Sequence, residues 1–154
     1  MSEIYLESLA NAIKNLKIAD HMIYVTYPVI KDKRLVLKAL DNLYESLIGI
    51  INSILQYDYL NKRINLSKDS KENFQIFQEK SAKRFNISES ELNELSAILS
   101  IIERHRKSPM EFTRREKIVI MSDNLTTASI DSDKIKLYLR FAKRLIDKAR
   151  FVFG

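Results

Sequence analysis

One stretch, residues 35–60, constrains the fold of this chain more than any other. Its apolar residues recur at alternating steps of three and four, which is the spacing of one face of an α-helix. These residues are Val36, Leu40, Leu43, Leu47, Ile50, Ile54 and Tyr57, with Tyr44, Ile48, Ile51 and Leu55 forming a second stripe beside them. A helix that is apolar on most sides needs neighbours on most sides. The stretch therefore predicts the central helix of a bundle, ending near Asp58 to Arg63.

The composition favours long helices around this central one. Only two glycines and two prolines occur in 154 residues, against ordinary usage of about 7% and 5%. A chain of this length can bury roughly 70% of the surface that its unfolded form exposes, so a single domain needs no covalent crosslink. Cysteine is absent, which excludes disulfides and thiolate metal sites. We therefore predict an all-α, single-domain bundle of four to five helices over residues 1–154.

The first half of the chain is expected to form a long antiparallel helical hairpin. Apolar spacing predicts a first helix over about residues 3–24, with Ser2 as its N-cap. Pro28 interrupts this pattern, and the residue before a proline, Tyr27, is biased toward an extended conformation. We therefore expect the turn to span residues 27–32, with Asp32 capping the central helix.

Local signals also place the helices of the middle segment. Residues 61–70 are polar and typical of a turn, and Ser70 is the expected cap of a short helix. Ser88, followed three residues later by Glu91, matches a capping box. The helix that begins there is expected to run to about Arg106.

The pattern then changes to an extended segment near residues 110–121. Apolar residues alternate there with period two, which is typical of strands. The segment is either a hairpin turning at residues 114–116 or an extended strap over the bundle, and residues 122–124 are expected to close it. The last helix is expected to begin near Asp131 or Ser132 and to continue to the end of the chain.

The excess of positive over negative charge is confined to the last third of the chain. Residues 1–103 contain 13 Lys or Arg and 14 Asp or Glu, whereas residues 104–154 contain 13 and 6. The net charge of +6 therefore originates in the last third. This asymmetry suggests an anionic partner, and the alternative is a generic basic surface that serves solubility alone.

The candidate nucleic-acid-binding residues are the cations of this last third. They are Arg104, Arg106, Lys107, Arg114, Arg115, Lys117, Lys136, Arg140, Lys143 and Arg144. If the extended segment packs near the last helix, these residues become one surface suited to phosphates. Phe112, Tyr138 and Phe141 are available to stack on bases, although such residues more often belong to the core. Because no recognised nucleic-acid-binding motif accompanies the charge, sequence-specific readout is not implied.

The chain lacks the common signatures of catalysis. Both glycines are isolated, so there is no phosphate-cradling loop, and Gly49 is better explained by a close approach of two helices. Neither histidine follows a Glu-x-x pattern, which argues against a di-iron site, and two histidines without cysteine argue against zinc. Helical ribonucleases of the HEPN family carry an Arg a few residues before a His. Residues 98–101 and 14–17, at that spacing before His105 and His21, contain no Arg. We therefore name no catalytic residue, metal or cofactor.

Two polar residues leave alternatives open. Asp20 lies on the apolar seam of the first helix, so either it is buried with a partner or the seam drifts and Ala19 and Met22 face inward. His105 lies among cations at the end of a helix. It is either a phosphate contact or proton donor, or one of the cations that a helix C-terminus favours.

We expect a non-catalytic binding protein that is associated with nucleic acid or with an RNP as an accessory protein. Its expected partner is RNA or another polyanion. The alternative is a helical protein–protein scaffold, adaptor or homodimerisation module, because tyrosines are common at interfaces and several fall on the first hairpin. These are Tyr24, Tyr27, Tyr44, Tyr57 and Tyr59, which otherwise line the core. With no targeting segment and no apolar run of about 20 residues, we expect a cytoplasmic protein without a membrane partner.

Overall fold

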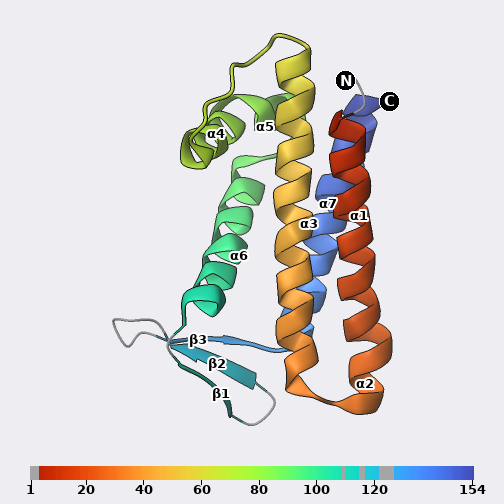
Figure 1. Cartoon of the computed structure of the whole chain (residues 1–154), viewed down its shortest axis with the longest axis vertical. Coiled ribbons are helices and arrows are strands. Elements are labelled where there is room, and N and C mark those ends of the chain that lie inside the picture. The colour runs from red at the N-terminus through yellow and green to blue at the C-terminus, as the bar shows by residue number, and fades with distance from the viewer. Residues whose placement is uncertain (1–3, 109, 115–116, 122–126) are drawn as a thin grey trace.

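The computed structural model of the chain describes residues 4–108, 110–114, 117–121 and 127–154. The chain is an all-α bundle with a small antiparallel sheet at one end, as predicted (Figure 1). The expected N-cap Ser2, the expected helix start at Glu3 and the expected turn at residues 122–124 lie outside the described residues.

A long helical hairpin forms the frame of the bundle. Helix α1 (Ile4–His21) continues through a π-helical turn (Met22–Thr26) into α2 (Tyr27–Ile30), and α3 (Lys33–Leu60) returns beside it. Gly49 of α3 allows the two helices to approach closely, because a Cβ there would lie only 3.0 Å from the Ala12 Cβ. The predicted hairpin and the predicted role of this glycine are therefore confirmed.

The turn of this hairpin differs from the expectation at Pro28. Tyr27 is helical (φ −60°, ψ −43°) rather than extended, and the helix continues to Ile30. The π-helical turn explains the difference. The Tyr27 N–H bonds to the Met22 carbonyl five residues back, which widens the helix before Pro28 and relieves the clash that a proline ring makes inside an α-helix.

Capping interactions set the ends of several helices. Asp32 caps α3, since its Oδ1 accepts a hydrogen bond from the Arg34 N–H (2.9 Å). Ser88 and Glu91 form the predicted capping box at the start of α6 (Glu89–Lys107). The Ser88 Oγ accepts from the Glu91 N–H (3.1 Å), and the Glu91 Oε1 accepts from the Ser88 N–H (3.0 Å). Both predicted caps are confirmed.

A short helical arm joins α3 to α6. It consists of α4 (Ser70–Ile76), a second π-helical turn (Phe77–Ser81) and α5 (Ala82–Arg84). Its cap is Asp69 and not Ser70, because the Asp69 Oδ1 accepts a hydrogen bond from the N–H two residues further on (2.9 Å). A carboxylate also interacts favourably with the positive end of the helix dipole, which explains why the acid takes this position.

The extended segment is a hairpin that becomes part of a three-stranded sheet. Strands β1 (Met110–Arg114), β2 (Lys117–Met121) and β3 (Thr127–Ile130) pair antiparallel in the order β1-β2-β3. The hairpin alternative is thus correct, whereas β3 was not predicted. Ile118 and Ile130 are paired in register and both are buried, so the sheet packs on the helices through this face.

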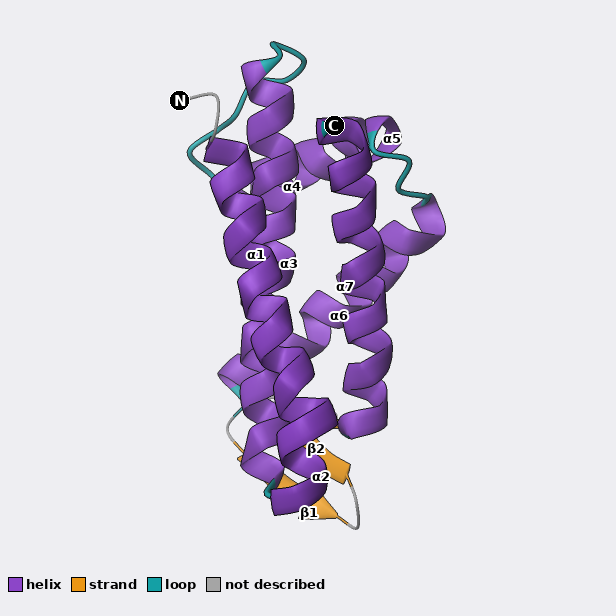
Figure 2. Cartoon of the chain, turned by 90° about the vertical axis from the view of Figure 1, so that its right-hand side faces the viewer, coloured by secondary structure: helices purple, strands orange, loops and turns teal. Residues whose placement is uncertain are grey.

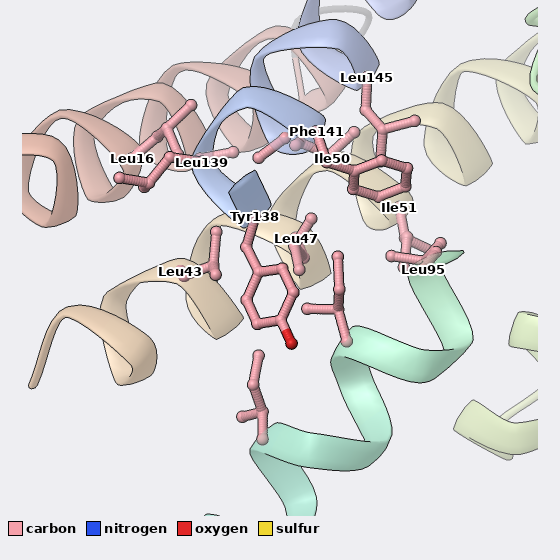
Figure 3. Packing of buried hydrophobic residues seen from close by; sticks show 14 of the residues in the cluster. Leu16, Leu43, Leu47, Ile50, Ile51, Leu95, Tyr138, Leu139, Phe141 and Leu145 are labelled. Carbon is pink, nitrogen blue, oxygen red and sulfur yellow. The ribbon is translucent and has the colours of Figure 1, made fainter. Parts of the chain in front are cut away.

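Helix α7 (Ser132–Phe153) completes the bundle and contacts both α1 and α3. It begins as predicted, with the Asp131 Oδ1 accepting a hydrogen bond from the Lys134 N–H (2.8 Å). Figure 3 shows the core between these helices and α6, where the labelled side chains are Leu16, Leu43, Leu47, Ile50, Ile51, Leu95, Tyr138, Leu139, Phe141 and Leu145. In Figure 2 the sheet and α2 lie at one end of the bundle and both chain ends lie at the other.

Candidate nucleic-acid interface

Helix α7 has one buried face and one basic face. The residues that it buries are Ile135, Tyr138, Leu139, Phe141, Ala142, Leu145, Ile146 and Ala149. With about 3.6 residues per turn, the predicted cations Lys136, Arg140, Lys143 and Arg144 fall on the opposite face, and Arg150 falls beside them. All of them are exposed except Lys136, which is partly covered. The predicted cations of the last helix therefore share one face of α7.

One edge of this basic face contacts α1. The Lys143 Nζ lies 3.0 Å from the Asp20 Oδ1, and the Lys136 ammonium lies 5.1 Å from the centre of the Tyr24 ring. These contacts also decide between the alternatives for Asp20: Ala19 is fully buried, while Asp20 is partly exposed and ion-paired. The apolar seam of α1 therefore drifts around the helix, and Asp20 binds α7 at its edge.

Helix α1 adds two lysines to this face that the sequence did not indicate. Lys17 and Asp20 of α1 and Tyr24 of the π-helical turn follow one another at steps of three and four, so they lie along one side of this continuous helix, and Asp20 and Tyr24 contact α7. Lys14 lies one turn before Lys17. Both lysines are exposed, and among the described residues neither side chain has a hydrogen-bond or ion-pair partner. Their charge was hidden because acids elsewhere in residues 1–103 cancel it.

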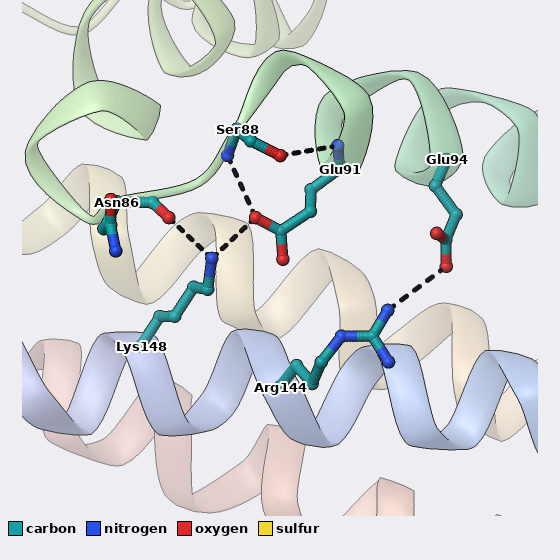
Figure 4. A network of polar contacts seen from close by, with 6 residues as sticks. All are labelled: Asn86, Ser88, Glu91, Glu94, Arg144 and Lys148. Atoms are coloured by element: carbon teal, nitrogen blue, oxygen red, sulfur yellow. Dashed lines mark hydrogen bonds and ion pairs between the residues drawn. The ribbon is translucent and has the colours of Figure 1, made fainter.

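The other edge of α7 is attached to α6 by a network of polar contacts (Figure 4). The Lys148 Nζ donates to the Glu91 Oε1 (2.6 Å) and to the Asn86 carbonyl (2.5 Å). An Arg144 Nη lies 3.5 Å from the Glu94 Oε2. Partial burial raises the pKa of Glu91, but the hydrogen bonds from Lys148 and from the capping box together lower it more, so the pKa lies below its ordinary value of 4.5. The cations at this edge serve to hold α7 against α6.

We use the name α1–α7 basic face for the charged residues on this side of α7 together with Lys14, Lys17 and Asp20 of α1. Its cations are Lys14, Lys17, Lys136, Arg140, Lys143 and Arg150, and its acids are Asp20, Asp133 and Asp147. Arg140 and Arg150 are exposed, and neither side chain has an acid partner within the described part of the chain. Because the cations outnumber the acids on this face, it attracts anions.

Among the cations of α6, Arg106 is held against α3 and not against α7. Its guanidinium lies 4.2 Å from the centre of the Tyr44 ring, and an Nη lies 3.9 Å from the Glu45 Oε1. A cation over an aromatic ring at this distance is a favourable contact. Arg106 therefore contacts α3 and is not part of the α1–α7 basic face.

The other predicted cations lie at the sheet end of α6. Arg104 is partly exposed, and Lys107 and Lys117 are exposed. Arg114 pairs with Lys117 in the β1–β2 register, but only its backbone is described, and Arg115 lies outside the described residues. Among the described residues, Lys136 and Lys143 of α7 thus contact the first helix of the hairpin, whereas Arg106 of α6 contacts α3. The sequence had suggested one common surface on the condition that the extended segment packs near the last helix.

His105 links three elements at the same end of α6. Its Nδ1 lies 2.8 Å from the Glu111 Oε2 of β1, and its Nε2 lies 3.1 Å from the Asp41 Oδ1 of α3. The His105 side chain is only 13% exposed. Both ring nitrogens are therefore engaged by carboxylates, and His105 is a structural link rather than an accessible phosphate contact.

The aromatic residues considered for base stacking are part of the core. Tyr138 and Phe141 are buried. Burial raises the pKa of Tyr138 above its ordinary value of 10.0, and the charges of Asp131 and Glu94 add to this effect. The side chain of Phe112 lies outside the description of the structure. The α1–α7 basic face is therefore suited to phosphate contacts and not to base stacking.

No protein-family model, curated protein or solved structure matches the chain. The function can therefore be inferred only from the geometry described above. The described residues contain no group of three or more His, Asp or Glu side chains that could hold a metal ion. Within that same part of the chain, no helix has the length and apolar character needed to cross a bilayer.

Proposed function

We propose that this chain is a non-catalytic protein that binds nucleic acid through the α1–α7 basic face. In this role it is an accessory protein that associates with RNA or with an RNP. The observation that supports this most is that Asp20 and Tyr24 contact the basic face of α7, on the side of the helix that also carries Lys17. Side chains from two helices far apart in the sequence thereby contribute to one positively charged surface.

The dimensions of the face suit a duplex backbone. Lys136 and Arg150 are 14 residues apart in one helix, which corresponds to about 21 Å at about 1.5 Å per residue. Double-stranded DNA carries one charge per about 1.7 Å of its axis, so a surface of this length spans several phosphates. Binding would depend on counterion release and would be largely independent of sequence.

The test is the affinity for a labelled RNA duplex and a labelled DNA duplex, measured by fluorescence anisotropy between about 50 and 200 mM salt. The double variant Arg140→Glu, Arg150→Glu should lower the affinity about tenfold or more and reduce the salt slope by about one unit per lost contact. The matched control, Lys107→Glu with Lys117→Glu, changes the net charge equally and should have little effect.

Two results would remove the proposal. The first is the absence of binding to either duplex at low salt. The second is an equal loss of affinity in the two double variants, since that would mean that total charge matters and the α1–α7 basic face does not.

A second candidate function, a helical scaffold or homodimerisation module, is favoured by an apolar groove at the end of the bundle where both chain ends lie. The groove has a volume of about 690 Å³ and lies between the start of α1 and the segment that follows α3. Its lining includes Ile4, Tyr59, Leu60 and Leu66, which are all 39–50% exposed. Sedimentation velocity tests self-association: a dimer that Leu60→Glu converts to a monomer supports it, and a wild-type monomer contradicts it.

A further inference from the structure

The tip of the long hairpin exposes apolar side chains that do not contribute to the core. Val25 is 54% exposed, Val29 is 82% exposed and Ile30 is 61% exposed. These residues lie within six positions of one another, around the last turn of the helix that α1, the π-helical turn and α2 form together. Contiguous exposed apolar residues on a folded protein mark a site of interaction.

The fold holds these side chains in place at the outer end of the molecule. The π-helical turn allows the helix to continue past Pro28, so that Val29 and Ile30 are presented from a helix and not from an extended loop. The Lys33 Nζ donates a hydrogen bond to the Tyr27 hydroxyl (2.6 Å) and lies 5.3 Å from the centre of its ring. Figures 1 and 2 both show α2 at the same end of the molecule as the sheet.

Cations follow this apolar tip closely in the sequence. The charged residues of the segment 22–38 are Lys31, Asp32, Lys33, Arg34 and Lys38. Its single acid, Asp32, is engaged with Arg34, whose Nη2 lies 2.6 Å from the Asp32 Oδ2. Lys31 and Lys38 are exposed, and neither side chain has an acid partner among the described residues. The tip therefore combines protruding apolar groups with a net positive charge.

We propose that this tip docks on the surface of an anionic lipid bilayer, with Val25, Val29 and Ile30 entering between the headgroups and Lys31 and Lys38 contacting their phosphates. Shallow insertion of apolar side chains, supported by basic residues, is how surface-bound segments attach to acidic membranes. Attachment of this kind requires no spanning helix. It goes beyond the proposed binding of nucleic acid and is independent of it.

The small number of apolar residues at the tip favours a bilayer over a protein partner. A standard protein interface buries about 800 Å² and some 20–30 residues on each side. The tip offers three strongly exposed apolar residues, whereas a bilayer accepts a small apolar group without needing a complementary surface. The positive charge around the tip also complements acidic headgroups.

The first experiment measures co-sedimentation of the full chain with vesicles of phosphatidylcholine, with and without phosphatidylserine. The chain should bind only the vesicles that contain phosphatidylserine. Val29→Glu with Ile30→Glu should lower the partition coefficient about tenfold or more, because apolar contact is replaced by charge repulsion. The control, Leu137→Glu with Phe151→Glu, adds the same charge at exposed apolar positions of α7 and should lower it much less.

A second experiment reports insertion directly. The chain contains no tryptophan, so Val29→Trp introduces a single fluorophore at an exposed site. Its emission should shift to shorter wavelength on phosphatidylserine vesicles, whereas Phe151→Trp should show no shift.

Several outcomes would overturn the proposal. These are the absence of binding to phosphatidylserine vesicles, an unshifted tryptophan emission in the Val29→Trp variant, and an equal loss in the two Glu double variants. Vesicle binding that Arg140→Glu with Arg150→Glu abolishes and the tip variant retains would assign the membrane contact to the α1–α7 basic face instead. A dimer that only the tip variant dissociates would assign the tip to a second copy of the chain.

Discussion

At the scale of single residues, Asp58 is the group whose environment is most unusual. Its side chain is fully buried, and the Arg84 Nε and Nη2 donate to its Oδ2 (3.1 and 2.9 Å). The Arg63 Nη1 lies 3.8 Å from the Oδ1, which has no hydrogen-bond partner among the described residues. The carboxylate thus joins α3 to α5 at the place where the chain leaves the central helix.

Replacing Asp58 should be costly. We expect Asp58→Asn to lower the free energy of unfolding by about 1–3 kcal/mol, because the buried carboxylate loses its charge-assisted hydrogen bonds from Arg84, while the Arg84 side chain, 33% exposed, can still be solvated. Urea denaturation measures this change. The control is Glu94→Gln, whose ion pair with Arg144 is about half exposed on both sides, and it should cost less than about 1 kcal/mol. Equal losses in the two variants would contradict the importance of burial.

Glu91 should make stability depend on pH. Burial raises its pKa, but the hydrogen bonds from Lys148 and Ser88 outweigh burial and hold the pKa in the folded protein below 4.5. The ionised form therefore stabilises the fold above the pKa of the unfolded chain, and that contribution is lost as the pH falls through the lower folded pKa. The difference in unfolding free energy between the wild type and Glu91→Gln should shrink as the pH falls from 7 toward about 3. A difference that is constant with pH would contradict this assignment.

At the scale of elements, the contact between α1 and α3 depends on the absence of a side chain at Gly49. A Cβ added there would lie 3.0 Å from the Ala12 Cβ and 3.4 Å from the Ser8 carbonyl oxygen. Gly49→Val should therefore separate the helices and lower the free energy of unfolding by about 1–3 kcal/mol. Ala97→Val, at an exposed position of α6, is the control and should cost a few tenths of a kcal/mol. Thermal unfolding measures both.

Two other elements show where local sequence signals were overridden. Pro28 predicts a break in the helix, but a π-helical turn accommodates it, and the tip is helical as a result. Strand β3 has four residues, too few to reveal a period-two pattern, and it is defined by pairing with β2. In both cases backbone hydrogen bonds to other residues decided the conformation.

At the scale of the whole molecule, stability and the proposed binding should respond differently to salt. The core is apolar and continuous across the helices. Each exposed ion pair on the surface contributes little to the free energy of unfolding. Raising the salt toward about 1 M shortens the Debye length to about 3 Å. It should abolish nucleic-acid binding while the unfolding temperature changes by only a few degrees. A parallel loss of both would mean that the charged faces hold the bundle together.

The α1–α7 basic face was only partly predictable from the sequence. The cations of α7 share a face because helical spacing is visible in the sequence, and the grouping of Lys136, Arg140 and Lys143 follows from it. Their association with Lys14 and Lys17 depends on how α1 packs against α7, and the net charge of each region conceals it. The expected joining of these cations with those near residues 104–117 did not follow from any local signal.

The helices, most of their caps and the basic face of α7 could be predicted from local patterns, because these depend on side chains a few residues apart along one helix. Which helix faces meet could not be predicted in this way. Arg106 is held by α3, Asp20 binds Lys143 of α7, and His105 and Asp58 are enclosed by distant partners. Contacts between helices are selected by the packing of the entire core, and no short stretch of the chain carries that information.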